Sequence, residues 1–320
     1  MTQAEYKYRD TVNLIACALL LFSGAFFAFG WLISFLGLWT RTLAAPWGEL
    51  IYQSIYALLY AAVFLFPVWF FLRVRCRACP PCEMALKPKM QGDVWAYLFA
   101  GLALIHLAAW LNAVLMETVG VSSNTVETMV HEAQSNGGLV LQFLVMAVVP
   151  PFVEELLFRG VVLGNLLPFG KWQAILGSAV LFGLMHQSVE QLLYATVGGL
   201  VLGYIYVATR SIWPCILLHL VNNGTSVLQA AFYARLSAET ATAISTVLQS
   251  GIYCMGLIGG AYLLLRKHPA RSTDVTPVES DGETLTAGRR LRLFLSPAML
   301  TFIAVTLVQT VIRLWIALLA

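Results

Sequence analysis

Three charged residues interrupt an apolar stretch at 153–160, which reads VEELLFRG. Glu155 and Arg159 are four residues apart, so on a helix they share a face, and the order Glu before Arg favours an ion pair. Glu154 lies about 140° around the helix from Arg159, at 3.6 residues per turn, and is reached less easily. One carboxylate is therefore expected to be neutralised, while the other stays available to accept and return a proton.

Two histidine motifs follow at helical spacing. FGLMH ends at His186, one turn after Phe182, and HLVNN places His219 and Asn223 on one face, with Asn222 expected to point elsewhere. A carboxylate and an imidazole can make water a nucleophile, and a second imidazole with an amide N–H can donate hydrogen bonds to an oxyanion. Each such group alone is more often a contact between helices, but three matched spacings favour a shared site for peptide hydrolysis.

The motifs EELLFR, FGLMH and HLVNN resemble the pattern EExxxR, FxxxH and HxxxN of the CPBP family. These are the CAAX-processing and bacteriocin-processing membrane proteases, also called Abi or type II CAAX prenyl endopeptidases. The resemblance covers roughly 138–232. It implies that Glu154 and His186 activate water, that His219 and Asn223 form the oxyanion hole, and that no metal or other cofactor takes part. The residues to which it gives a supporting role are Glu155, Arg159 and Phe182.

The rest of the chain must position these groups within a membrane. Of its 320 residues, 59% are hydrophobic and 11% are charged, whereas soluble domains carry about 25% charged residues. A spanning helix needs about 20 mostly apolar residues, and its backbone must satisfy its own hydrogen bonds. We therefore expect an all-α, polytopic bundle of about eight to nine spans. The candidates lie at 11–39, 49–72, 93–116, 138–165, 172–188, 191–209, 213–232, 246–266 and 293–320.

Lysine and arginine residues predict the orientation of the bundle. They gather before the first span, after the second and between the eighth and ninth, and none lies in the loop that follows the third span. This distribution places the N-terminus in the cytoplasm. The catalytic groups are then expected to share a cavity that opens to the cytoplasm. The small net charge of +3 gives no reason to expect a nucleic-acid partner.

Three regions are expected. Residues 1–137 hold N-terminal spans and a basic loop with cysteines, 138–232 form the catalytic core, and 233–320 hold C-terminal spans with a flexible cytoplasmic linker at 267–291. The cysteines of that loop, in CRACPPC, are Cys76, Cys79 and Cys82. They lack a fourth ligand for a closed zinc site, so reduced thiols are the favoured interpretation. The remaining cysteines are expected to be small buried hydrophobic residues, and these are Cys17, Cys215 and Cys254.

The favoured hypothesis is an intramembrane endopeptidase acting on a membrane-anchored protein or peptide, prenylated or leader-bearing, in a bacterial plasma membrane. A non-catalytic immunity factor, scaffold or transporter is the alternative from another class. A zinc protease is the third, because Glu154, His186 and His219 could ligate zinc, although the chain has no HExxH motif. His106, alone in the middle of a span, is interpreted as a hydrogen-bonded helix contact. The oligomeric state is left open.

Overall fold

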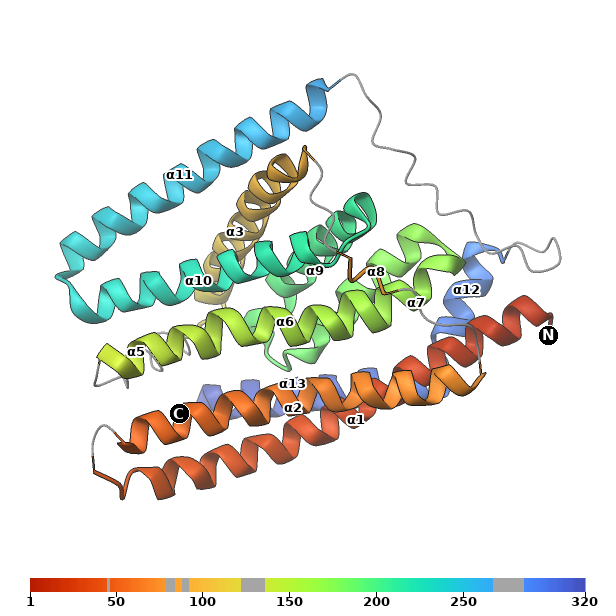
Figure 1. Ribbon diagram of the computed structural model, residues 1–320, viewed down its shortest axis with the longest axis horizontal. Helices are drawn as coiled ribbons and strands as arrows, with labels where there is room; N and C mark the ends of the chain where they lie inside the picture. Colours follow the sequence, from red (N-terminus) through yellow and green to blue (C-terminus); the bar gives the residue numbers. More distant parts are fainter. Residues whose placement is uncertain (45–46, 79–83, 88–91, 122–135, 267–284, 320) are drawn as a thin grey trace.

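The computed structural model describes residues 1–319 except 45–46, 79–83, 88–91, 122–135 and 267–284. Within these ranges every regular element is a helix, which confirms the all-α prediction. The continuous helices are α1 (Gln3–Thr40), α2 (Trp47–Ala78), α3 (Val94–Thr118), α8 (Lys171–Met185), α9 (Val189–Thr209), α10 (Trp213–Arg235), α11 (Ala238–Leu265), α12 (Ala287–Phe294) and α13 (Pro297–Leu319). A further long helix, residues 136–169, is broken into short segments (Figure 1).

Seven of the described helices are long and apolar enough to cross a membrane, so the chain is an integral multi-pass membrane protein. Each of the nine predicted spans coincides with a helix. Two of these nine helices, α8 and α10, are not among the seven that are long and apolar enough to cross a membrane, and the sequence explains why. Helix α8 has only 15 residues, and α10 carries a histidine and two asparagines in its middle.

The helices form a bundle in which the broken helix lies between two other groups. Helices α1 and α2 pack together on one side, with α13 against α1, and α11 packs on α3 on the other side (Figure 1). The broken helix contacts both α2 and α10, and α8 packs along α9. Residues from helices far apart in the sequence therefore meet in the middle of the bundle.

Two prolines explain where the long helix breaks. Its segments are α5 (Asn136–Phe143), the π-helix η1 (Leu144–Val148), α6 (Val149–Glu155), a second π-helix η2 (Leu156–Leu163), α7 (Gly164–Leu166) and the 3₁₀ turn η3 (Leu167–Phe169). Pro150 and Pro151 have no N–H, so the carbonyls one turn before them lose their usual partners. The wider π turn precedes them, as expected where a helical ladder is interrupted. The two glutamates thus lie on a short α segment flanked by π turns.

Glycines allow α8 and α9 to approach closely. A Cβ at Gly183 would lie 2.7 Å from the carbonyl oxygen of Leu192, and one at Gly199 would lie 2.9 Å from the Cα of Ala179. Such backbone contact is typical of small residues at helix interfaces in membranes. Because α8 is short and held against α9, its last turn ends inside the bundle.

The cysteines and the linker differ in part from expectation. Cys215 is buried as predicted and its thiol donates to the carbonyl of Leu202 at 3.2 Å, but Cys17 and Cys254 are exposed on the outer surface of the helices. In a lipid-facing position a cysteine is as compatible with its surroundings as any small apolar residue, so the prediction of burial was wrong for these two. Of the CRACPPC motif, the structure describes only the backbone of residues 76–78, at the end of α2, so it does not test the interpretation of its cysteines.

The predicted linker is shorter than expected at its C-terminal end. Residues 267–284 lie outside the described ranges, but α12 already begins at Ala287. Arg289 pairs with Glu5 at the start of α1, and Arg290 donates to the carbonyl of Phe169. The final residues of the proposed linker are therefore a helix fixed to the body of the protein.

Candidate active site

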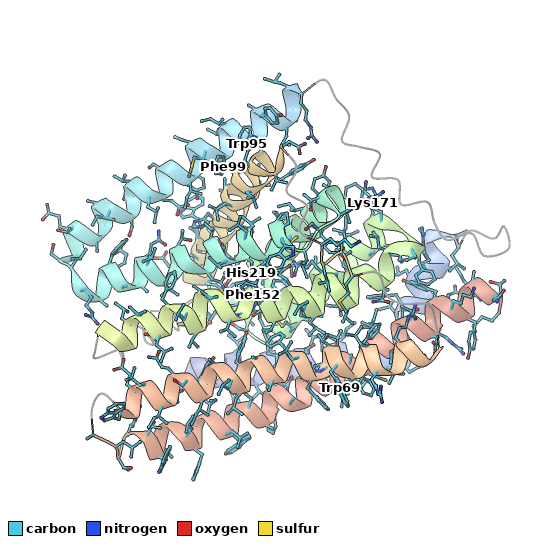
Figure 2. All side chains as sticks on the ribbon, in the orientation of Figure 1. Trp69, Trp95, Phe99, Phe152, Lys171 and His219 are labelled. Atoms are coloured by element: carbon cyan, nitrogen blue, oxygen red, sulfur yellow. The ribbon has the colours of Figure 1, made fainter. Side chains whose placement is uncertain are left out.

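A cavity of about 970 Å³ lies inside the bundle, between α2, α3, α6 and helices α8 to α11. The four residues expected to be catalytic, Glu154, His186, His219 and Asn223, all line it. Figure 2 shows His219 near the middle of the bundle, where α10 runs beside the broken helix. The structure therefore brings together the three motifs that the sequence separates by up to 69 positions, from 154 to 223.

Glu154 presents one bound and one free oxygen. Its Oε1 accepts a hydrogen bond from the hydroxyl of Tyr60 at 2.6 Å. Its Oε2 is buried, accepts no hydrogen bond from the described residues, and lies 3.9 Å from Nε2 of His219. That separation exceeds a hydrogen bond. The second oxygen can therefore accept a proton or a hydrogen bond from a molecule in the cavity.

Glu155 connects two other groups of the site. Its Oε1 lies 2.9 Å from Nδ1 of His219, and its Oε2 lies 3.0 Å from Nε of Arg159. The Arg159 N–H does not point at that oxygen, so the contact is an ion pair without an aligned hydrogen bond. Arg159 also donates to the carbonyl of Gly199 at 3.3 Å and lies 4.6 Å from the ring centre of Phe182. The ion pair between Glu155 and Arg159 is present as predicted. The contact between Glu155 and His219 was not predicted from the sequence.

His186 has one ring nitrogen fixed and one available. Its Nδ1 lies 2.8 Å from the carbonyl oxygen of Phe182, a terminal carbonyl of α8. Because a carbonyl can only accept, Nδ1 carries the proton, and Nε2 of the neutral ring holds a lone pair. The Phe182 ring stands at 83° to the rings of both His186 and His219, with centres 5.0 and 5.9 Å away. Phe182 thus holds the two imidazoles in position.

Asn223 is positioned by the proline break. Its Nδ2 donates to the carbonyl of Met146 at 3.3 Å. In an uninterrupted α-helix that carbonyl would accept from the N–H of residue 150, but Pro150 has none. Asn222 donates to Oδ1 of Asn223 at 3.2 Å and also lines the cavity, so the prediction that it points elsewhere was wrong. The amide of Asn223 keeps a second N–H that neither contact uses.

His106 is a helix contact, as interpreted from the sequence. Its two ring nitrogens lie 3.0 Å from Oε1 of Gln249 and 3.1 Å from Oγ1 of Thr225. These bonds tie α3 to α11 and α10. With both nitrogens engaged, His106 contributes to the cavity wall without a free group for chemistry.

The sequence analysis missed the tyrosines of α2. Tyr60 and Tyr56 line the cavity, and the rings of Tyr52, Tyr56 and Tyr60 follow one another with centres 6.2 and 6.0 Å apart. The available signal was their spacing of four in YQSIYALLY, which places three hydroxyls on one face of an apolar helix. The spacing does not indicate that this face of α2 contacts Glu154.

The zinc alternative needs a cluster of ligands. In the part of the chain that the structure describes, no group of three or more His, Cys, Asp or Glu side chains is placed to hold a metal ion. The imidazoles of His186 and His219 each have Nδ1 engaged by another group, so only their Nε2 atoms could ligate a metal.

Comparison with known proteins agrees with the resemblance in the motifs. Residues 136–225 match the model of a family described as type II CAAX prenyl endopeptidase Rce1-like, and this range contains all three motifs. A Bacillus subtilis (strain 168) protein, YdiL, named as a candidate membrane peptidase, is 30% identical over 111 residues. That alignment covers 34% of this chain and 44% of the relative, so the chain spans less than half of the relative's length. No solved structure matches the chain.

Proposed function

We propose that the chain belongs to the CPBP family, which the match of residues 136–225 to the Rce1-like model supports, and that the protein is an intramembrane endopeptidase. It hydrolyses a peptide bond by direct attack of a water molecule. The observation that carries the proposal is the free Oε2 of the buried Glu154 carboxylate, which faces the same cavity as two imidazoles and an amide. A carboxylate so placed is unusual for a purely structural helix contact, because such groups are normally satisfied.

Glu154 and His186 activate the water. Tyr60 holds Oε1 of Glu154, so Oε2 is the oxygen that takes the proton from the attacking water. Nε2 of His186, the unprotonated nitrogen, accepts the second hydrogen bond of the same water and orients its lone pair. As the water oxygen bonds to the substrate carbonyl carbon, its proton moves to Glu154.

His219 and Asn223 stabilise the resulting oxyanion. One proton lies between Glu155 and Nδ1 of His219, and a second on Nε2 makes that nitrogen a donor toward the cavity. The unused N–H of Asn223 is the other donor. Arg159 pairs with Glu155, which in turn holds Nδ1 of His219, so the ring is fixed by its far nitrogen and Nε2 remains for the cavity.

The intermediate then collapses toward products. The C–N bond breaks as the proton taken up by Glu154 passes to the leaving nitrogen, which departs as an amine. The new carboxyl group carries the oxygen of the water. No residue of the chain is acylated at any step, because the water itself is the nucleophile.

The substrate is a membrane-anchored protein or peptide, and the setting is a bacterial plasma membrane. The first statement is supported by the position of the cavity inside a bundle of apolar helices, and by the family to which 136–225 are similar. The second is supported by the Bacillus subtilis relative.

The experiment is a proteomic comparison of cells expressing the wild-type protein and Glu154→Gln. Glutamine keeps the size and the hydrogen bond to Tyr60 but cannot take the proton. Glu239→Gln, an exposed carboxylate at the start of α11, is the matched control. We expect cleaved membrane-anchored peptides with the wild type and with Glu239→Gln, and their intact precursors with Glu154→Gln. Identical peptide sets in all three cell lines would refute the proposal.

A further inference from the structure

The side-chain amide of Asn223 is held from both of its ends. Its Nδ2 donates to the carbonyl of Met146 at 3.3 Å, and its Oδ1 accepts from Nδ2 of Asn222 at 3.2 Å. A backbone carbonyl can only accept, so the end of the Asn223 amide that faces Met146 must be its NH₂ group. The oxygen of the same amide then faces Asn222, and the group of Asn222 that meets it must be a donor. The two contacts therefore define the orientation of both amides.

Turning the Asn223 amide over would break both contacts at once. Its oxygen would then face the carbonyl of Met146 and its NH₂ would face the NH₂ of Asn222, so both pairs would become repulsive. Because the amide is planar, fixing its oxygen and one N–H also fixes the direction of the other N–H, which is the proposed oxyanion donor. A hydrogen bond to the amide oxygen also polarises the amide and strengthens its N–H as a donor. Asn222 thus supplies one of two restraints on that donor.

The main chain at Asn222 is itself anchored. Its carbonyl accepts from the hydroxyl of Thr225 at 2.7 Å and from the hydroxyl of Ser226 at 3.2 Å. Oγ1 of Thr225 lies 3.1 Å from one ring nitrogen of His106 on α3, and the other ring nitrogen lies 3.0 Å from Oε1 of Gln249 on α11. This turn of α10 is therefore fixed to two neighbouring helices, and the side chain of Asn222 starts from a defined position.

The contact with Asn223 accounts for the polar residue at position 222. One residue before Asn223 lies about 100° around a helix, and that angle alone would point Asn222 away from the site. Its side chain lines the cavity instead, and within the described ranges its amide makes no hydrogen bond besides the one to Asn223. Polar side chains on membrane helices are costly unless they are bonded. The bond to Asn223 is therefore the interaction that keeps an amide at this position.

We propose that Asn222 is a positioning residue of the active site. It holds the Asn223 amide in the orientation that directs an N–H at the oxyanion, and it acts through Asn223 rather than on the reacting atoms. The inference rests on the proposed function, because it extends the oxyanion role given to Asn223. The HLVNN motif then contributes three residues to the reaction, with His219 and Asn223 as donors and Asn222 behind them.

A double-mutant cycle tests the proposal. Asn222→Leu removes the donor at nearly the same volume, and the rate is measured on the membrane-anchored substrate found by the proteomic comparison. We expect kcat to fall about 3-fold to 10-fold, the worth of one neutral hydrogen bond, with KM little changed. In an Asn223→Ala background the same substitution should not lower kcat further, because the amide that it orients is gone. Leu228→Ala, at an exposed position of α10 outside the cavity lining, is the control and should cleave as the wild type does.

A spectroscopic measurement needs no substrate. In protein made with isotope-labelled asparagine, the NH₂ proton pair that disappears from the NMR spectrum in Asn223→Ala belongs to Asn223. Because the amide has one orientation, this pair should give a single set of signals. In Asn222→Leu the set should shift or broaden, whereas in Leu228→Ala it should stay in place. The same change is expected in a Glu154→Gln background, so the result does not depend on proteolysis.

Three results would overturn the proposal. The first is a wild-type kcat in Asn222→Leu, and the second is a loss by the same factor with and without the Asn223 amide, as expected of a residue that only supports the helix. The third is an Asn223 signal that Asn222→Leu leaves unchanged. If Asn222→Leu does not fold, Asn222→Ala removes the same donor with a smaller side chain and enters the same measurements. Failure of the proposed function would differ, because Glu154→Gln would then also cleave.

Discussion

Replacing Arg159 by methionine leaves the Glu155 carboxylate in the middle of the bundle with only His219 as its partner. The side chains of Arg159 and Glu155 are 1% and 0% exposed, and their charged atoms are 3.0 Å apart. Methionine keeps much of the apolar bulk of the arginine. The substitution therefore tests the charge rather than the packing.

The expected loss is large because the pair is buried. Removing one partner of a buried ion pair destabilises a protein by about 3–5 kcal/mol, since the other charge stays uncompensated. The arginine also lies over the ring of Phe182, a contact worth about 0.5–2 kcal/mol that is included in this range. Adding Glu155→Gln to Arg159→Met should restore more than half of the loss, because a neutral amide needs no counter-ion and still accepts from Nδ1 of His219.

The assay is the free energy of unfolding in mixed detergent micelles, from the midpoint of an SDS titration. Arg289→Met is the control, because Arg289 is 41% exposed in its pair with Glu5, so its loss should lower the midpoint much less than the loss of Arg159. If Arg159→Met were as mild as the control, or if the double variant were no more stable than the single one, the pair would not have the role described.

Three further outcomes concern catalysis. Tyr60→Phe removes a hydrogen bond to a charged acceptor, which is worth about 1.5–3 kcal/mol. The value of kcat should therefore fall about 10-fold to 100-fold while the protein stays folded. An unchanged kcat would mean that Tyr60 does not orient Glu154. Asn223→Ala removes one oxyanion donor and should lower kcat about 10²–10³-fold with little change in KM, and a pure KM effect would argue against that role. Treating the purified protein with a chelator should leave the rate unaltered, whereas a loss that zinc restores would favour the metalloprotease.

The parts of the site that depend on a single helix were accessible from the sequence. The pairing of Glu155 with Arg159 and the position of Phe182 next to His186 follow from a spacing of four residues. The helical architecture was equally accessible, because an apolar run in lipid must satisfy its own backbone.

The parts that depend on packing between helices were not accessible. The bond from Tyr60 to Glu154 joins residues 94 positions apart and exists because α2 packs against α6. The position of Asn223 depends on a carbonyl that Pro150 leaves free on another helix. The convergence of the three motifs on one cavity depends on how α6, α8 and α10 pack, which spacing within a motif does not indicate.

The most direct test of the central claim is the rate at which purified protein cleaves a substrate identified by the proteomic comparison. Glu154→Gln should lower that rate at least 10³-fold with unfolding unchanged, whereas Glu239→Gln should cleave as the wild type does. A folded Glu154→Gln protein that still cleaves within tenfold of the wild-type rate would show that this carboxylate does not activate the water.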